Sequence, residues 1–253
     1  MKPIRVISRI DLKGKNAVKG IQLEGIRVVG DPREMAERYY REGADELFLL
    51  DVVASLYERD LDLDLVRAIA EHVFIPITVG GRIRSVDQMR EILRSGGDKV
   101  AINTAAIARP DLLAEAVEAF GAQCIVLSIE AKKIAPGRWE AYTESGRQKT
   151  GLDAIEWAKQ GIALGVGELL ITSIDAEGTR SGFDLELMKT ISVFSPVPVI
   201  AHGGASTPES IKAVIVEAQV DAVSAASIYH YQEYTPNQVK EYFHGAGLNV
   251  RLV

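Results

Sequence analysis

The chain has a single cysteine, Cys124, among its 253 residues. One thiol cannot form an internal disulfide framework, which excludes a small secreted fold held together by disulfide bonds. Cys124 opens the apolar run 124–127, a setting that favours a small core residue over a catalytic thiol. We therefore expect a protein of a reducing compartment, the cytoplasm.

Long hydrophobic runs are also lacking. No apolar stretch approaches the ~18 residues that a membrane-spanning helix requires. The first five residues, Met1 to Arg5, lack the apolar region of a secretory signal. We expect no membrane partner and no signal peptide.

Positive charge is scarce as well. The 29 Lys and Arg residues are outnumbered by 35 Asp and Glu residues, giving a formal charge of −6. Nucleic-acid binding needs clustered positive charge, so we expect no nucleic-acid partner, although local sites for small anions remain compatible with this balance.

Histidine is rare, and its four positions show no spacing typical of metal ligands. They are His72, His202, His230 and His244. We expect no metal site and no cofactor.

Short β-branched runs alternate with longer helical patterns along the whole chain. This order predicts an α/β fold with a parallel sheet, and eight strands buried on both faces predict a single (β/α)8 TIM barrel. The expected strands are 5–10, 46–50, 77–79, 99–102, 125–129, 168–172, 199–201 and 222–225. Helix starts are expected at Asp31-Pro32, Ser85, Arg109-Pro110 and Thr207-Pro208.

One connection, 132–151, is too long for a plain βα loop. It contains the polar and aromatic alternation Trp139-Glu140-Ala141-Tyr142. We predict a small hairpin that covers the mouth of the barrel.

The two halves of the chain, about 1–122 and 123–253, repeat each other. A proline-led strand ending in Gly-Gly occurs at 76–81 and again at 198–204, and a strand that follows an aspartate occurs at 98–104 and again at 221–227. Two similar halves would place equivalent residues on opposite sides of one site within a single barrel domain.

Each half also ends its first strand with a carboxylate, Asp11 and Glu130, followed two residues later by a lysine, Lys13 and Lys132. Active sites of such barrels lie at the carboxyl ends of the strands. Two facing carboxylates there could act as general acid and base. Strand-end carboxylates that only bind the nearby lysines would give the same pattern.

The repeated Gly-Gly turns indicate two phosphate sites, because glycine lets backbone N–H groups approach an anion. A ligand with a phosphate at each end would fit this duplication. An isolated turn of this kind is also common without any ligand. The candidate residues are Gly81, Arg82, Asn103 and Thr104 in the first half, and Asp175, Gly178, Thr179, Gly203, Gly204, Ala226 and Ser227 in the second.

Four charged residues stand at strand starts, which belong to the opposite face of the barrel: Arg5, Glu46, Lys99 and Glu168. They could form a ring of paired charges across the bottom of the barrel. Alternatively, they are solvated residues that do not interact.

Over essentially its whole length the chain resembles the HisF family, the cyclase subunit of imidazole glycerol phosphate synthase. The resemblance rests on specific runs, among them Asp11-Leu12-Lys13, Thr78-Val79-Gly80-Gly81, Thr172-Ser173-Ile174-Asp175 and Asn249-Val250-Arg251-Leu252. It implies a glutaminase partner subunit that docks on the strand-start face, with Asp98 at this interface. It also implies that the four charged residues form a gate for ammonia.

The resemblance further implies that ammonia attacks a bisphosphorylated ribulosyl formimino-aminoimidazole-carboxamide ribotide, with Asp11 as one acid–base residue. The second acid–base position is Glu130, where the family has aspartate. A longer side chain moves the carboxyl by about 1 Å, a displacement that can cost ~10²-fold in rate. Arg9, Arg82, Glu177 and His202 depart from the family pattern as well.

With these departures the sequence resembles that of HisF-like paralogues found with surface-polysaccharide genes. The resemblance implies that such a paralogue supplies ammonia to an ATP-dependent amidotransferase that acts on a nucleotide sugar. The main prediction is a HisF-type synthase subunit that receives ammonia from a glutaminase and delivers it to a phosphorylated sugar substrate, either by histidine-pathway cyclisation or by this amidation. Two other classes are the sister phosphosugar isomerase of that pathway, which uses no ammonia, and a non-catalytic conduit whose pocket Arg82 blocks.

Overall fold

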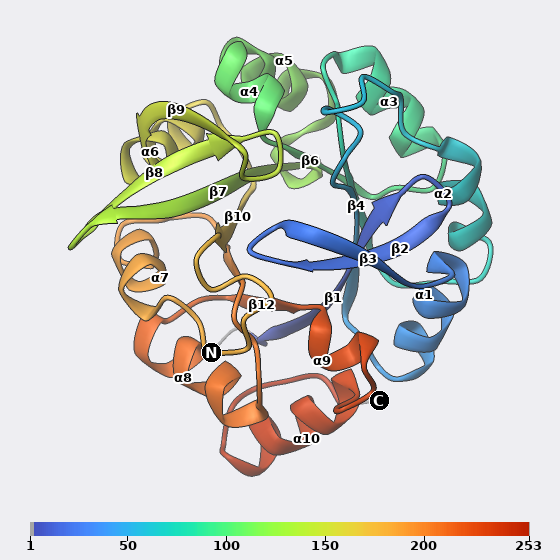
Figure 1. Cartoon of the computed structure of the whole chain (residues 1–253), viewed down its shortest axis with the longest axis vertical. Coiled ribbons are helices and arrows are strands. Elements are labelled where there is room, and N and C mark those ends of the chain that lie inside the picture. Colours follow the sequence, from blue (N-terminus) through green and yellow to red (C-terminus); the bar gives the residue numbers. More distant parts are fainter. Residues whose placement is uncertain (1–2, 253) are drawn as a thin grey trace.

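The computed structural model describes residues 3–252 and forms a closed barrel surrounded by helices (Figure 1). Eight parallel strands form the barrel. In ring order they are β1 (Arg5–Lys13), β4 (Glu46–Asp51), β5 (Ile77–Gly80), β6 (Lys99–Ile102), β7 (Ile125–Ala135), β10 (Glu168–Ser173), β11 (Val199–His202) and β12 (Ala222–Ala225). The ring is closed because β12 pairs with β1 and β7 pairs with β10. The predicted barrel and all eight predicted strands are confirmed.

Helices follow most strands and cover the outside of the ring. They are α1 (Pro32–Arg41), α2 (Leu63–Ala70), α3 (Val86–Arg94), α4 (Thr104–Ala108), α5 (Asp111–Phe120), α6 (Ala154–Ala163), α7 (Leu185–Ser192), α8 (Pro208–Ala218), α9 (Ser227–His230) and α10 (Pro236–Gly245), with a 3-10 turn at Ala122–Cys124. Three predicted starts are confirmed because Asp31, Ser85 and Thr207 each cap a helix through a side-chain oxygen. The helix expected at Arg109-Pro110 is α5, which begins one residue after Pro110.

Two antiparallel extensions stand above the mouth of the barrel. The predicted hairpin is confirmed and is larger than expected, since β7 continues to Ala135 and pairs with β8 (Arg138–Thr143), which pairs with β9 (Gln148–Asp153). A second hairpin, β2 (Asn16–Ile21) with β3 (Glu24–Gly30), was not predicted and crosses the mouth in Figure 1.

The interior of the barrel is layered. A separate apolar cluster fills its middle, with one or two inward side chains from most strands: Ile7, Phe48, Leu50, Ala101, Val126, Leu170, Ile200 and Ala222. Because strand side chains alternate between faces, the residues two positions earlier and later on each strand also point inward. The inward layers on either side of this cluster carry the polar and charged groups considered below.

Three aspartates fix the starts of strands on the opposite face. The side chains of Asp45, Asp98 and Asp221 accept hydrogen bonds from the backbone N–H groups of Val6, Ile77 and Val199 at 2.8, 2.8 and 2.9 Å. Asp98 and Asp221 are the aspartates of the repeated motif, so this part of the duplication has a structural purpose. The half-barrel boundary near residue 122 stays a prediction.

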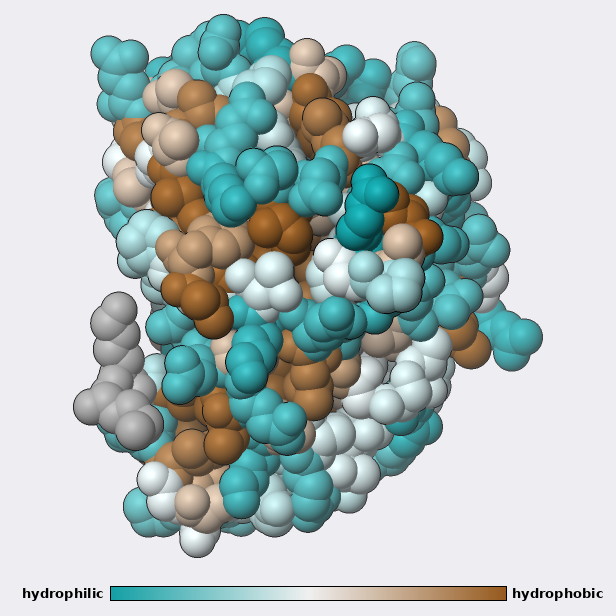
Figure 2. Space-filling view, turned by 90° about the vertical axis from the view of Figure 1, so that its left-hand side faces the viewer, coloured by the Kyte–Doolittle hydropathy of each residue, from teal (hydrophilic) through white to brown (hydrophobic). Residues whose placement is uncertain are grey.

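On the face shown in Figure 2, hydrophobic residues form small groups separated by hydrophilic ones. Cys124 is partly buried against the core, as its apolar context predicted. Among residues 3–252, every helix falls short of the length and apolar character needed to cross a bilayer.

Candidate active site at the mouth of the barrel

Asp11 lies near the end of β1, where its carboxylate is buried beside Arg9. The Arg9 Nε atom donates to Asp11 Oδ1 at 2.7 Å, and both side chains are at most 6% exposed. The two residues are neighbours because positions i and i+2 of a strand share one face. Burial disfavours the charged carboxylate, but the positive charges of Arg9 and Lys19 outweigh this effect and lower the pKa of Asp11.

Glu130 lies on β7 and is held by two donors from different segments. Its Oε2 atom accepts from Asn103 Nδ2 at 3.0 Å and from the Gly146 N–H at 2.8 Å. Asn103 also donates to the Tyr142 carbonyl oxygen at 3.1 Å, so the end of β6 is tied to the β8 hairpin through the same amide. The predicted hairpin therefore supplies one of the two hydrogen bonds that hold Glu130, a predicted catalytic residue.

Burial raises the pKa of Glu130 to about 7, although the Arg9 charge and the Gly146 hydrogen bond oppose this shift. The two carboxyl groups thus titrate in opposite directions. Near neutral pH Asp11 is an anion that can accept a proton, while a large fraction of Glu130 is a neutral acid that can donate one. Carboxyl groups with separated pKa values are the arrangement that general acid–base catalysis requires.

We expect the Glu130 proton to make folding stability depend on pH. The folded protein keeps this proton up to about pH 7, whereas the unfolded chain releases it near its usual pKa of 4.5. Stability contributed by Glu130 therefore falls as pH rises between these values, by about 3 kcal/mol. Urea unfolding of the wild type and of Glu130→Gln at pH 5 and pH 8 measures this, and parallel pH dependences of the two proteins would contradict it.

A cavity of about 410 Å³ opens beside Glu130 in the first half of the barrel. It is lined by the predicted phosphate-site residues Gly81, Arg82, Asn103 and Thr104, together with Arg9 and Glu130. Gly81 has φ +126° and lies against Asp51, whose Cβ would be 2.9 Å from an added Cβ, so only glycine suits this turn. Such a volume is typical of small-molecule sites.

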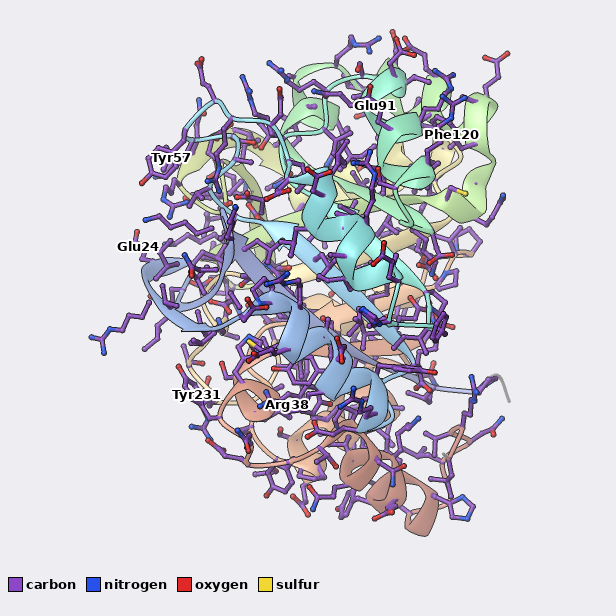
Figure 3. The ribbon with its side chains drawn as sticks, turned by 90° about the vertical axis from the view of Figure 1, so that its right-hand side faces the viewer. Glu24, Arg38, Tyr57, Glu91, Phe120 and Tyr231 are labelled. Carbon is purple, nitrogen blue, oxygen red and sulfur yellow. The ribbon has the colours of Figure 1, made fainter. Side chains whose placement is uncertain are left out.

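Arg82 forms part of the cavity wall and does not fill the cavity. Its Nη1 atom donates to the carbonyl oxygen of Glu58 and lies 3.5 Å from the Asp60 carboxylate. The guanidinium is thus already bound by the loop that follows β4. Tyr57 of this loop projects from the same side of the molecule as Glu24 of the β2–β3 hairpin (Figure 3).

The equivalent region of the second half is nearly closed. A crevice of about 10 Å³ lies among Gly178, Gly203, Gly204, Ala226 and Ser227, the residues predicted to hold the other phosphate. The remaining two candidates bind backbone groups instead: Asp175 accepts from the Lys133 N–H at 2.8 Å, and Thr179 Oγ1 donates to the Ala176 carbonyl at 2.7 Å. The structure therefore gathers the four first-half candidates around one cavity and five of the second-half candidates around a much smaller crevice, which Asp175 and Thr179 do not line.

His202 is buried at the end of β11 in the wall of this crevice. Burial and the Arg9 charge hold its pKa well below the ordinary value, so the ring is neutral. Its Nδ1 atom lies 3.0 Å from the Ser224 carbonyl oxygen, which can only accept, so Nδ1 carries the proton. The buried Nε2 atom then presents an unshared electron pair and has no partner among the described residues.

At the opposite face, four charged side chains form a closed ring. Arg5 Nη1 lies 2.6 Å from Glu46 and 2.7 Å from Glu168, and Lys99 Nζ lies 3.1 Å from Glu46 and 2.8 Å from Glu168. The interpretation as separate solvated charges was wrong. Asp98 is exposed beside Lys99, and its place at a partner interface stays a prediction.

Two ion pairs at the mouth were not predicted. The Arg9–Asp11 pair could have been found from the spacing alone, since the two residues share a strand face. The Lys19–Glu177 pair joins residues 158 positions apart, and its side chains are at most 4% exposed. Only the folded arrangement of β2 and the loop after β10 brings them together.

Comparison with known proteins places this geometry in context. Residues 5–235 match the family model described as "Histidine biosynthesis protein". The chain is 56% identical over 204 residues to the imidazole glycerol phosphate synthase subunit HisF of Legionella pneumophila, an alignment that covers 81% of this chain and 96% of that protein.

Proposed function

Because this chain belongs to the HisF family of histidine biosynthesis proteins, we propose that it acts as the cyclase subunit of imidazole glycerol phosphate synthase. It is then a lyase-type enzyme of histidine biosynthesis, and we place it in the cytoplasm. The observation that carries the mechanism is the buried pair of carboxyl groups at the mouth, Asp11 and Glu130, with pKa values shifted in opposite directions.

In the proposed reaction, ammonia attacks the keto carbon of the ribulosyl group of the ribotide. A C–N bond forms, neutral Glu130 gives its proton to the keto oxygen, and the Asp11 anion takes a proton from the attacking nitrogen. Loss of water then gives an imine. Ring closure and cleavage of the substrate's C–N bond yield imidazole glycerol phosphate and aminoimidazole carboxamide ribotide.

Ammonia would enter from a glutaminase subunit docked on the face that carries Arg5, Glu46, Lys99 and Glu168, with Asp98 at the interface. In this proposal the ring of ion pairs is the gate, because a passage opens only when a pair separates. Beyond it the apolar middle layer of the barrel leads to the layer that contains Arg9. An apolar passage admits neutral ammonia more readily than ammonium ion, since a charged group loses far more solvation.

The test is turnover of the ribotide by the purified chain with excess ammonium salt, followed through loss of substrate absorbance. We expect turnover with ammonium alone, and turnover with glutamine only after a HisH-type glutaminase is added. A folded chain that binds the glutaminase and leaves the ribotide intact would rule out the cyclase proposal.

A second candidate has specific support at the mouth. The chain would be a HisF-like paralogue that passes ammonia to an ATP-dependent amidotransferase acting on a nucleotide sugar. Glu130, Arg9 and Glu177 depart from the family pattern, and all three lie at the mouth of the barrel. There they alter the shape and charge of the proposed reaction centre relative to that pattern. Amidation of the sugar that needs this chain, the glutaminase and ATP, without any ribotide turnover, would support this candidate.

The other two hypotheses are less well supported. A conduit blocked by Arg82 is hard to reconcile with an open cavity of about 410 Å³ in which Arg82 is bound to the wall. The isomerase hypothesis explains neither the closed ring of charges nor the 56% sequence identity to a HisF subunit.

A further inference from the structure

Three neighbouring strands carry a polar residue at the same level inside the barrel. Thr172 of β10 is in register with His202 of β11, and His202 is in register with Ser224 of β12. Each of them lies two positions after a residue of the apolar middle cluster, on the side of the mouth, so its side chain also points into the barrel. We call these three residues the inner polar site.

The polar atoms of the inner polar site are buried and lack protein partners. All three residues are at most 3% exposed. Within residues 3–252, the Oγ1 atom of Thr172, the Nε2 atom of His202 and the Oγ atom of Ser224 make no hydrogen bond. A buried polar group without a partner costs free energy, and most such groups in proteins are satisfied. Three of them on adjacent strands therefore indicate a small polar guest that bonds to them.

The space at this site suits a very small molecule. Adjacent strands of a sheet lie about 4.8 Å apart, so one molecule between the side chains can reach more than one of them. His202 and Ser224 line the crevice of about 10 Å³, which holds about one molecule of the size of water. The Gly203-Gly204 turn, a predicted phosphate site, follows the end of β11, so a phosphate there would lie nearer the mouth than this guest.

The hydrogen-bonding pattern of the site suits ammonia. The Nδ1 proton of His202 is bound to the Ser224 carbonyl oxygen, so Nε2 can only accept. Ammonia can donate one N–H to Nε2, while its lone pair accepts from the hydroxyl group of Thr172 or Ser224. Water satisfies the same groups when ammonia is absent. The site can thus hold ammonia in one orientation through bonds to its N–H groups and to its lone pair.

The charged groups around His202 favour a neutral guest over an ammonium ion. They form two pairs, Arg9 with Asp11 and Lys19 with Glu177. Because each carboxylate already has its own cation, neither is free to balance a buried ammonium ion, which would lose far more solvation than ammonia. Burial and the Arg9 charge also hold the pKa of His202 well below its ordinary value, so the ring stays neutral and Nε2 stays an acceptor.

We propose that His202 is a positioning residue for ammonia: together with Thr172 and Ser224 it binds one ammonia molecule between the apolar middle of the barrel and the Asp11 carboxylate. The site lies on the route proposed above, since its strands carry the middle cluster just before it and the charge of Asp11 acts on the His202 ring. The inference rests on the proposed function in taking ammonia as the molecule that crosses the barrel. It applies equally to cyclisation and to amidation of a sugar, because both need ammonia at the mouth.

Ring nitrogen-15 NMR spectra of the histidines test this binding without any ribotide. At pH 9, where ammonium salts supply free ammonia, we expect the His202 Nε2 signal to shift with increasing ammonium chloride. The same salt at pH 6.5, where almost all of it is ammonium ion, should leave the signal unchanged, as should potassium chloride at either pH. Methylammonium chloride at pH 9 should also have no effect, because its extra methyl group exceeds a crevice of about 10 Å³. The signal is assigned by its absence from His202→Gln.

Steady-state kinetics with ammonium salt and ribotide provide a second test. His202→Leu, which removes the acceptor, is expected to raise KM for ammonia about 3- to 10-fold, the effect of losing one hydrogen bond. The turnover number at saturating ammonia and KM for the ribotide should stay unchanged, because only the binding of ammonia is lost. His202→Gln should restore most of the loss, since its side-chain carbonyl can accept in place of Nε2. A residue that only supported the fold would change all three constants.

Ser173→Ala is the matched control. The Ser173 hydroxyl group is as buried as that of Thr172 and also lacks a partner in the described part of the chain, but it is the next residue on β10 and points to the outside of the barrel. We expect wild-type constants for this variant. Thr172→Val keeps the shape of the side chain and removes its hydroxyl group, so it replaces His202→Leu if that variant does not fold, and it should also raise KM for ammonia.

Three results would overturn the proposal. They are a His202 Nε2 signal that does not respond to ammonia at pH 9, an equal response to methylammonium chloride, and a wild-type KM for ammonia in both His202→Leu and Thr172→Val. A protein that shows the ammonia-dependent shift but leaves the ribotide intact would instead count against the cyclase proposal alone.

Discussion

Asp11→Asn is expected to lower the turnover number of the ribotide reaction by about 10²- to 10⁴-fold, the range that general acid–base catalysis contributes. Asparagine keeps the size of the side chain, and its carbonyl oxygen can still accept from Arg9 Nε. The substitution therefore removes the proton acceptor while preserving the hydrogen bond that holds it. Steady-state rates with saturating ammonium salt and ribotide measure the loss.

Asp64→Asn provides the comparison for this variant. Asp64 lies in the first turn of α2, where its exposed carboxylate pairs with Arg67 at 2.6 Å and lines neither cavity. We expect its turnover number to stay close to that of the wild type. Equal activity of Asp11→Asn and Asp64→Asn would remove Asp11 from the mechanism.

Arg9→Met is expected to destabilise the protein by about 3–5 kcal/mol at pH 8, because it leaves the buried Asp11 carboxylate without its partner. The direction of the pH dependence should also change. In the wild type, the lowered pKa of Asp11 makes a contribution to stability that is present above its ordinary value of 3.8 and is lost as pH falls through the folded-state value. Without Arg9, burial raises this pKa, so the Asp11 contribution should become less favourable as pH rises.

Urea unfolding between pH 4 and pH 8 measures both effects. The double variant Arg9→Met/Asp11→Asn should recover much of the lost stability, since it contains no unpaired buried charge, and the coupling energy of the cycle should be large. Lys133→Met breaks the exposed Lys133–Glu186 pair and should change stability by at most about 1 kcal/mol. Strictly additive Arg9 and Asp11 effects would contradict the pairing.

The barrel strands were predictable because each contains a short apolar run that is buried, as in β10, where all six residues are buried. The β2–β3 hairpin was missed for the opposite reason. Its two strands contain three glycines, and apolar side chains such as Ile21 and Val28 are 62% and 63% exposed. No core-facing periodicity marks such a hairpin in the sequence.

The site was predictable to the extent that it depends on strand ends. Asp11, Asn103 and Glu130 follow from the rule that the carboxyl ends of parallel strands converge. The unequal volumes of the two predicted phosphate sites do not follow from it, because the wall of the second site includes Lys19 of the hairpin and Glu177 of a distant loop, which only the fold brings together. A repeated sequence motif indicates equivalent backbone but says nothing about which side chains enter the space between.

Closure of the ring has a consequence for the order of folding. Strand β1 pairs with β12, in register from Arg5 with Ala222, and the Lys240 side chain of α10 reaches back to Asp45 at 3.0 Å. A nascent chain must therefore leave the first strand with one free edge until nearly all of the protein has been synthesised. Pairing across so long a separation also costs more loop-closure entropy than any other strand pairing in the ring. Truncation near residue 220 would consequently leave β1 with an unpaired edge, and an open barrel of this kind is prone to edge-to-edge association.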